Sequence, residues 1–144
     1  MDNKMTIKFS SVSENEAFAR NVIASFLISS DPSVEWLSDI KTAVSEAVTN
    51  AIVHGYPSGG GEVEMKAEIT DKYLHIVVSD KGVGIENVDE ALEPFYTTKP
   101  DEERSGMGFT IIKTFTDKLT VSSEKGKGTT VDMIKYFDGG EGNI

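Results

Sequence analysis

Apolar and polar residues alternate near the start of the chain, as they do in a strand with one buried face. The apolar positions are Met5, Ile7 and Phe9, and polar residues separate them. Similar patterns predict four further strands, at residues 63–69, 73–79, 119–123 and 129–137. The second of these contains the continuous apolar run Ile76-Val77-Val78, which indicates a well-buried position in the sheet. The last two are separated by a short glycine-rich turn and form a predicted hairpin.

A first long helix is predicted directly after the first strand. The segment Ser13-Glu14-Asn15-Glu16 is typical of a capping box, in which Ser13 is the N-cap and Glu16 reaches back to it. We expect this helix to continue to about Ile28. Two shorter helices are predicted at residues 88–92 and 109–117.

A second long helix is predicted to begin at Asp31-Pro32, where an acidic N-cap precedes a proline, and to end at Gly55. Apolar residues recur at three- and four-residue steps and define its buried face: Val34, Leu37, Ile40, Val44, Val48 and Ala51. Glu46, Asn50 and His54 form a separate polar stripe. We expect this stripe to border a surface or a pocket.

The length and composition are those of one ordinary domain. The chain has 144 residues, which predicts a single domain over residues 1–137 followed by a flexible tail at 138–144. It contains no cysteine, which excludes disulfides, cysteine-ligated metals and a thiol nucleophile and favours a reducing compartment. No apolar stretch approaches the ~20 residues of a membrane span. We therefore expect a cytoplasmic protein that does not enter a membrane.

The formal charge of -10 indicates which kinds of molecule the protein can bind. An excess of acidic residues repels phosphate backbones, so direct binding of nucleic acid is not expected. A basic protein partner would be attracted. Any phosphate group that the protein binds must be held by local contacts.

Several short glycine clusters are candidates for a site that binds phosphate groups. Taken singly, each is more typical of a turn than of a phosphate site, because none completes a dinucleotide fingerprint or a Walker P-loop. The two histidines, His54 and His75, are interpreted as structural. The order of the clusters along the chain is more informative than any one of them. The order is Glu46-x-x-x-Asn50, then Asp80-x-Gly82-x-Gly84, then Ser105-Gly106-x-Gly108, and last Gly128-Thr129-Thr130.

In this order the sequence resembles the GHKL superfamily of ATPases and kinases over nearly the whole chain. Glu46 to Ala51 is similar to the N box, Asp80 to Gly84 to the G1 box, and Gly106 to Phe109 to a short G2 box. The segment from Pro94 to Ile111 resembles the lid region of one branch, the bacterial anti-sigma factors that are also serine-protein kinases. The resemblance implies an α/β fold of the Bergerat type, a two-layer α+β sandwich with a mixed, mainly antiparallel sheet and helices on one face.

The residue chemistry agrees with an adenine nucleotide site. An ionised Asp80 only accepts hydrogen bonds, so it suits the N6 amino group of adenine and opposes the carbonyl of guanine. Gly82 and Gly84 would allow close approach to the base, and the resemblance adds Thr130 as a second adenine contact. Further nucleotide contacts are expected at Asn50, Thr97, Thr98, Lys99, Arg104, Ser105, Gly106, Met107 and Gly108. Lys99 and Arg104 could equally be solvated cations or partner contacts.

Two residues of the N box are expected to act on the phosphates. Asn50 offers a neutral oxygen ligand suited to Mg²⁺, and Glu46, one helical turn earlier, is the expected base that accepts the proton of an attacking hydroxyl group. Outside this context, a Glu-x-x-x-Asn pair on a helix is usually just a solvated face.

The resemblance implies an ATP- and Mg²⁺-dependent serine kinase that sequesters a sigma factor, here one of sporulation. Its substrate would be an anti-anti-sigma factor, and the branch acts as homodimers. Two alternatives stay open: a binding module in which the nucleotide is only a structural ligand, and the isolated ATP domain of a sensor histidine kinase.

Overall fold

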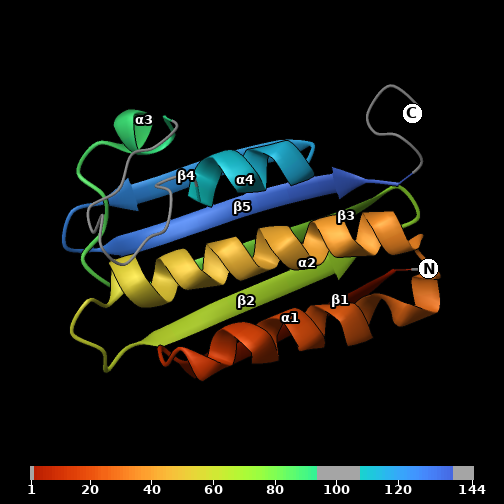
Figure 1. Ribbon diagram of the computed structural model, residues 1–144, viewed down its shortest axis with the longest axis horizontal. Coiled ribbons are helices and arrows are strands. Elements are labelled where there is room, and N and C mark those ends of the chain that lie inside the picture. The colour runs from red at the N-terminus through yellow and green to blue at the C-terminus, as the bar shows by residue number, and fades with distance from the viewer. Residues whose placement is uncertain (1, 94–107, 138–144) are drawn as a thin grey trace.

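The computed structural model describes residues 2–93 and 108–137, which form a sheet with helices packed against one face (Figure 1). Across the sheet, the strands lie in the order β1 (Asn3–Ser10), β2 (Glu62–Ile69), β3 (Tyr73–Asp80), β5 (Gly128–Tyr136) and β4 (Lys118–Glu124). All neighbouring pairs are antiparallel. The expected two-layer, mainly antiparallel fold is therefore confirmed, and the parallel pair that a mixed sheet would contain is absent from the described residues.

The helices follow the predicted order along the chain. They are α1 (Glu14–Leu27), the 3₁₀ helix η1 (Ile28–Ser30), α2 (Val34–Thr49), the π-helix η2 (Asn50–Gly55), α3 (Val88–Ala91) and α4 (Gly108–Phe115). α2 crosses the middle of the sheet, and α1 and α4 pack on its two sides (Figure 1). The other face of the sheet carries no described helix.

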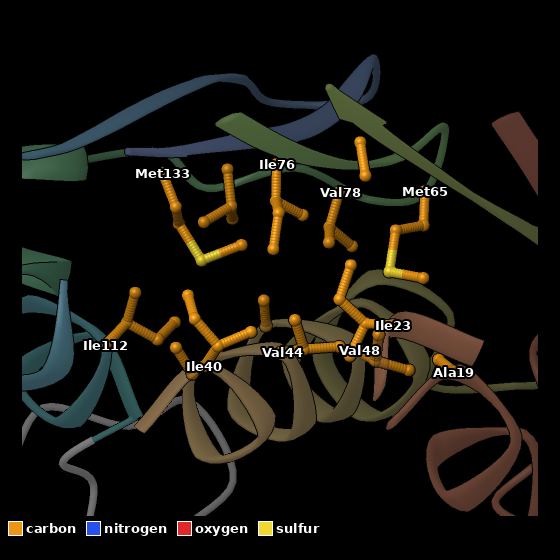
Figure 2. Close-up of a cluster of buried hydrophobic side chains, with 14 of the residues drawn as sticks. Ala19, Ile23, Ile40, Val44, Val48, Met65, Ile76, Val78, Ile112 and Met133 are labelled. Carbon is orange, nitrogen blue, oxygen red and sulfur yellow. The ribbon is translucent and has the colours of Figure 1, made fainter. Parts of the chain in front are cut away.

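The core lies between α2 and the three central strands. Figure 2 shows Ile40, Val44 and Val48 of α2 directed toward the sheet, opposite Ile76 and Met133. All five side chains are at most 1% exposed. The three- and four-residue steps in α2 thus predicted the helix residues of this core, and the apolar run in β3 predicted that Ile76 is buried.

The predicted capping box at Ser13 is wrong. An N-cap residue needs an extended backbone to bring its side chain to the free N–H groups. Ser13 instead has helical angles, with φ −60° and ψ −31°, and caps nothing. Its hydroxyl group donates to Glu14 Oε1 at 3.2 Å.

The start of α2 also differs from the prediction. Asp31 takes a left-handed conformation, with φ 48°, as the C-cap of η1, and aspartate adopts this region more readily than most residues. Ser33 is the N-cap instead, and its Oγ accepts from the N–H of Trp36 at 3.1 Å. Val34, predicted on the buried face, is 87% exposed. Trp36 anchors this end, because its Nε1 donates to the Tyr136 carbonyl at 2.9 Å.

The far end of α2 was predicted at Gly55, and the helical backbone does end there, but its last residues form the π-helix η2. Such wide turns occur often at functional sites. None of the described helices is long and apolar enough to cross a membrane. The expected tail, 138–144, lies outside the described residues.

Candidate functional site

A pocket of about 380 Å³ opens where η2, the end of β3 and the β4–β5 hairpin meet. Among the residues expected to bind a nucleotide, Asn50, Asp80 and Gly84 line it. The structure thus brings together the N box and the G1 box, which are about thirty residues apart in the sequence. They meet because α2 crosses the sheet and ends above the end of β3.

Asp80 is the buried acid of this pocket. It is the last residue of β3, it points to the helix side of the sheet, and it is only 8% exposed. Its Oδ1 accepts from the N–H of Gly82 at 2.9 Å. Burial raises the pKa of the Asp80 carboxyl, and hydrogen bonds from the backbone of Gly82 and Thr129 oppose this shift. The pocket therefore presents one desolvated acceptor.

Gly55 and Gly82 leave room for this carboxylate and its turn. A Cβ atom on Gly55 would lie 2.8 Å from Asp80 Cγ. A Cβ on Gly82 would lie 1.8 Å from the Gly55 carbonyl oxygen, and that oxygen accepts from Val83 N at 2.9 Å. Gly82 does not line the described pocket, and its lack of a side chain lets two backbone segments pack together.

Gly84 lines the pocket and also packs against protein backbone. Its φ is +74°, and a Cβ there would lie 2.1 Å from the Glu124 carbonyl oxygen. The hairpin is further tied to this loop by the N–H of Gly126, which donates to the Val83 carbonyl at 2.6 Å. These contacts place Lys125 at the rim of the pocket.

Asn50 is the first residue of η2, and it lines the pocket. Its Nδ2 is buried and has no hydrogen-bond partner in the part of the protein that the structure describes. Buried amide groups are rarely left unpaired, so an unpaired one in a pocket is a mark of a ligand site. An unpaired N–H group of this kind suits an acceptor such as a phosphate oxygen, whereas a cation would need the side-chain oxygen Oδ1 of Asn50.

Glu46 and His54 flank Asn50 along the same helix. Glu46 is half-buried on α2 and is not among the residues that line the described part of the pocket. His54, which was interpreted as structural, does line it. The signal for His54 was already in the sequence, because it shares a polar stripe with Glu46 and Asn50.

Thr129 occupies the place that was expected for Thr130. Thr129 lies opposite Asp80 in the β3–β5 register, is 9% exposed, and lines the pocket. Thr130 lies opposite Ser79 and Ser122, so its side chain points to the other face of the sheet. Thr130, the expected adenine contact, therefore does not face the pocket, whereas Thr129 does.

The other expected contacts cannot be placed in the same way. Gly108 is buried and begins α4. The remaining ones, together with most of the segment from Pro94 to Ile111 that resembles a lid, lie outside the described residues: Thr97, Thr98, Lys99, Arg104, Ser105, Gly106 and Met107. Within the described residues there is no cluster of three or more acidic or histidine side chains that could hold a metal. A Mg²⁺ here would depend on Asn50 and on the phosphates.

Comparison with known families identifies the domain. The family described as the histidine kinase-like ATPase domain matches residues 9–135, which include all the residues of the pocket. The chain belongs to this family. The resemblance seen in the boxes is thereby confirmed at the level of the ATPase domain.

Curated proteins similar to this chain include anti-sigma F factors. The one from Clostridium acetobutylicum is 56% identical over 137 residues, covering 95% of this chain and 96% of that protein. Those from Clostridium beijerinckii and Clostridium perfringens are 54% and 55% identical, over 95% and 96% of this chain and 96% and 99% of theirs. The sequence is therefore similar to that group over nearly its whole length.

Solved structures show the same ATPase fold. The structure of the RsbU and RsbW domains of a Mycobacterium tuberculosis protein matches with a TM-score of 0.64 at 17% identity, covering 92% of this chain and 32% of that one. The catalytic domain of the histidine kinase ThkA matches with a TM-score of 0.58 at 15% identity, covering 92% and 95%. At these identities the likeness concerns the fold alone.

Proposed function

We propose that the protein is an ATP-dependent serine kinase that also binds a sporulation sigma factor and holds it inactive. One observation carries the proposal: a buried carboxylate, Asp80, and an unpaired buried amide, Asn50, line one pocket of a histidine kinase-like ATPase domain. The names of its relatives, anti-sigma F factors, supply the proposed biological role.

In this proposal each residue acts through its own chemistry. Asp80 accepts a hydrogen bond from the N6 amino group of adenine and thereby disfavours guanine. The side-chain oxygen of Asn50 holds Mg²⁺, which neutralises phosphate charge when it is bound. Glu46 lies one helical turn from Asn50, about 6 Å along the axis, and accepts the proton of the attacking serine. Phosphate contacts are assigned to Thr97–Lys99 and Arg104–Gly108.

The proposed partners are a sigma factor and an anti-anti-sigma factor, the second of which is phosphorylated. Both would be met in the cytoplasm. We also propose a homodimer, for which β1 is suited because it is an edge strand of the sheet.

A nucleotide-binding module without catalysis is a second candidate. The observation that favours it is the absence of Glu46 from the lining of the described pocket. A separate histidine kinase domain, as in ThkA, is the third reading of the same fold.

One experiment separates these functions. The protein is incubated with ATP labelled on the γ-phosphate and with candidate anti-anti-sigma proteins, and the product is tested for stability in acid. We expect labelled substrate that survives acid, as phosphoserine does. An acid-labile product would indicate a histidine kinase, and unlabelled substrate with retained ATP binding would indicate a binding module.

A further inference from the structure

We propose that Tyr56 is a positioning residue for adenine recognition, because its hydroxyl group holds the turn that carries Asp80. This inference rests on the proposed role of Asp80 as the acceptor for the adenine amino group. Tyr56 follows η2 directly and was not singled out by any motif.

The Tyr56 hydroxyl group makes two short hydrogen bonds. The hydroxyl oxygen accepts a hydrogen bond from the N–H of Lys81 at 2.7 Å, and the O–H donates one to the carbonyl of Glu62 at 2.7 Å. Lys81 is the residue after Asp80, and Glu62 is the first residue of β2. The hydroxyl group therefore ties the end of β3 to the start of the neighbouring strand.

The ring of Tyr56 is itself held in place. It packs on Gly61 so closely that a Cβ there would lie 2.3 Å from the ring atoms Cδ1 and Cε1. Two hydrogen bonds of 2.9 Å join Gly61 to Ser11. The N–H of Ser11 donates to the Gly61 carbonyl, and the N–H of Gly61 donates to Ser11 Oγ. The hydroxyl group thus projects from a supported ring.

Two consecutive residues, Gly55 and Tyr56, accept hydrogen bonds from the turn that follows β3. Gly55 accepts from Val83 N at 2.9 Å, and Tyr56 accepts from Lys81 N. Between these two contacts lies Gly82, whose N–H donates to the Asp80 carboxylate at 2.9 Å. The direction of the carboxylate therefore depends on a turn whose first half is held by Tyr56.

Loss of this hydroxyl group should affect recognition more than folding. Both of its hydrogen bonds lie at an exposed part of the surface, where water can satisfy the Lys81 N–H and the Glu62 carbonyl but does not fix them to a supported ring. A hydrogen bond to a ligand, by contrast, depends strongly on the position of its acceptor. A small shift of the turn would therefore weaken the bond between Asp80 and the adenine amino group.

The test compares Tyr56→Phe with wild type for two ligands, ATP and purine riboside triphosphate, which lacks the N6 amino group. Calorimetry should show that wild type prefers ATP. In the variant, affinity for ATP should fall roughly 5- to 20-fold, while affinity for the analogue should change less than about twofold. The control is Tyr73→Phe, the same change at the opposite end of β3, where the ring packs on Tyr136 with centroids 6.4 Å apart. It should alter neither affinity.

Each other result overturns the inference. An equal loss for both ligands would make Tyr56 a general structural residue, and no loss would remove it from recognition. Equal affinity of wild type for both ligands would remove Asp80 as the reader of the amino group. Because binding is measured without phosphoryl transfer, these results do not depend on kinase activity.

A second measurement needs no variant and covers the case in which Tyr56→Phe fails to fold. In wild type, amide hydrogen exchange at Lys81 should be slow although this residue is exposed, because its N–H is bonded to Tyr56. Exchange as fast as in an unprotected loop would overturn the inference.

Discussion

Burial of Asp80 has two opposite effects, one on the stability of the folded protein and one on ligand binding. The Asp80 carboxylate lies at the end of a buried strand, is 8% exposed, and has a pKa raised by burial. Burial makes the charged form costly for the folded protein, but it also strengthens a hydrogen bond from a ligand amino group. Perturbed acids of this kind are typical of functional sites.

The first prediction concerns binding by Asp80→Asn. The variant loses a charge-assisted hydrogen bond to adenine and offers a donor that guanine can accept. Affinity for ATP should fall by about 1–3 kcal/mol, and the preference over GTP should shrink. Titration of both nucleotides against both proteins measures this change, and an unaltered ATP affinity would place the adenine contact elsewhere.

The same variant tests the raised pKa without any nucleotide. Because the pKa of Asp80 lies above its ordinary value of 3.8 in the folded protein, the stability linked to this group is fully present below pH 3.8 and is lost as the pH rises through the raised pKa. The stability of Asp80→Asn relative to wild type should therefore increase between pH 3 and pH 7, as measured by urea denaturation at both pH values. A difference in stability that stays the same at the two pH values would contradict the desolvation argument.

The prediction for Glu46 concerns catalysis. Glu46→Gln keeps the size of the side chain but cannot accept a proton, so phosphoryl transfer should fall about 10²- to 10⁴-fold with little change in ATP affinity. Glu35→Gln, an exposed change in the first turn of α2, is the matched control and should leave the rate intact. Equal kinase rates in wild type and Glu46→Gln would remove Glu46 from the mechanism.

The sequence could predict that Asn50 and Asp80 meet, but not which threonine joins them. Both Thr129 and Thr130 follow Gly128, and side chains in a strand alternate between faces. The choice depends on the register between β3 and β5, which pairs Asp80 with Thr129. Register is a property of the folded sheet, so a short sequence motif does not specify it.

At the scale of single elements, strands were easier to predict than helix starts. Every predicted strand is present with ends within two residues of the prediction. Strand patterns reflect burial on one face, which the sheet as a whole enforces. A helix cap instead depends on the backbone angles of one residue, and the left-handed Asp31, which ends η1, cannot cap α2.

The two serine residues before α1 and α2 give a direct test of this difference. Ser33→Ala removes a hydrogen bond to Trp36 N and should lower the free energy of unfolding by about 1 kcal/mol. Ser13→Ala removes no cap and should cost less than about 0.5 kcal/mol. Urea denaturation of both variants measures the two values. A larger cost at Ser13 would restore the capping box that the sequence predicts.

The π-helix η2 is the part of the site that periodicity could not predict. A helical pattern of apolar residues continues through Ala51 and Ile52, both of which are buried as an ordinary helix would bury them. His54 and Asn50 lie four residues apart in η2, and both line the pocket. The polar stripe indicates that they share a side of the helix, but the periodicity of the sequence does not distinguish a π-helical end from an ordinary one.

At the scale of the whole molecule, the pocket joins distant parts of the chain. Asn50 comes from the end of α2, Asp80 from β3 in the middle of the sheet, and Thr129 from β5 near the end of the described chain. The helix α2 and the strands β3 and β5 also contribute to the core in Figure 2, together with α1, β2 and α4. A ligand that holds these elements together therefore stabilises the fold as a unit, and not one loop alone.

The last prediction follows from this coupling. A ligand that binds only the folded state raises its stability by about 2.7 kcal/mol at a concentration one hundred times its Kd. For a domain of this size, ADP at that concentration should raise Tm by roughly 5–11 °C in a single transition. Asp80→Asn, measured at the same ADP concentration, should show a smaller increase because it binds more weakly. If calorimetry instead resolved two transitions and ADP moved only one, the pocket would belong to a unit that unfolds separately from the core between α2 and the sheet.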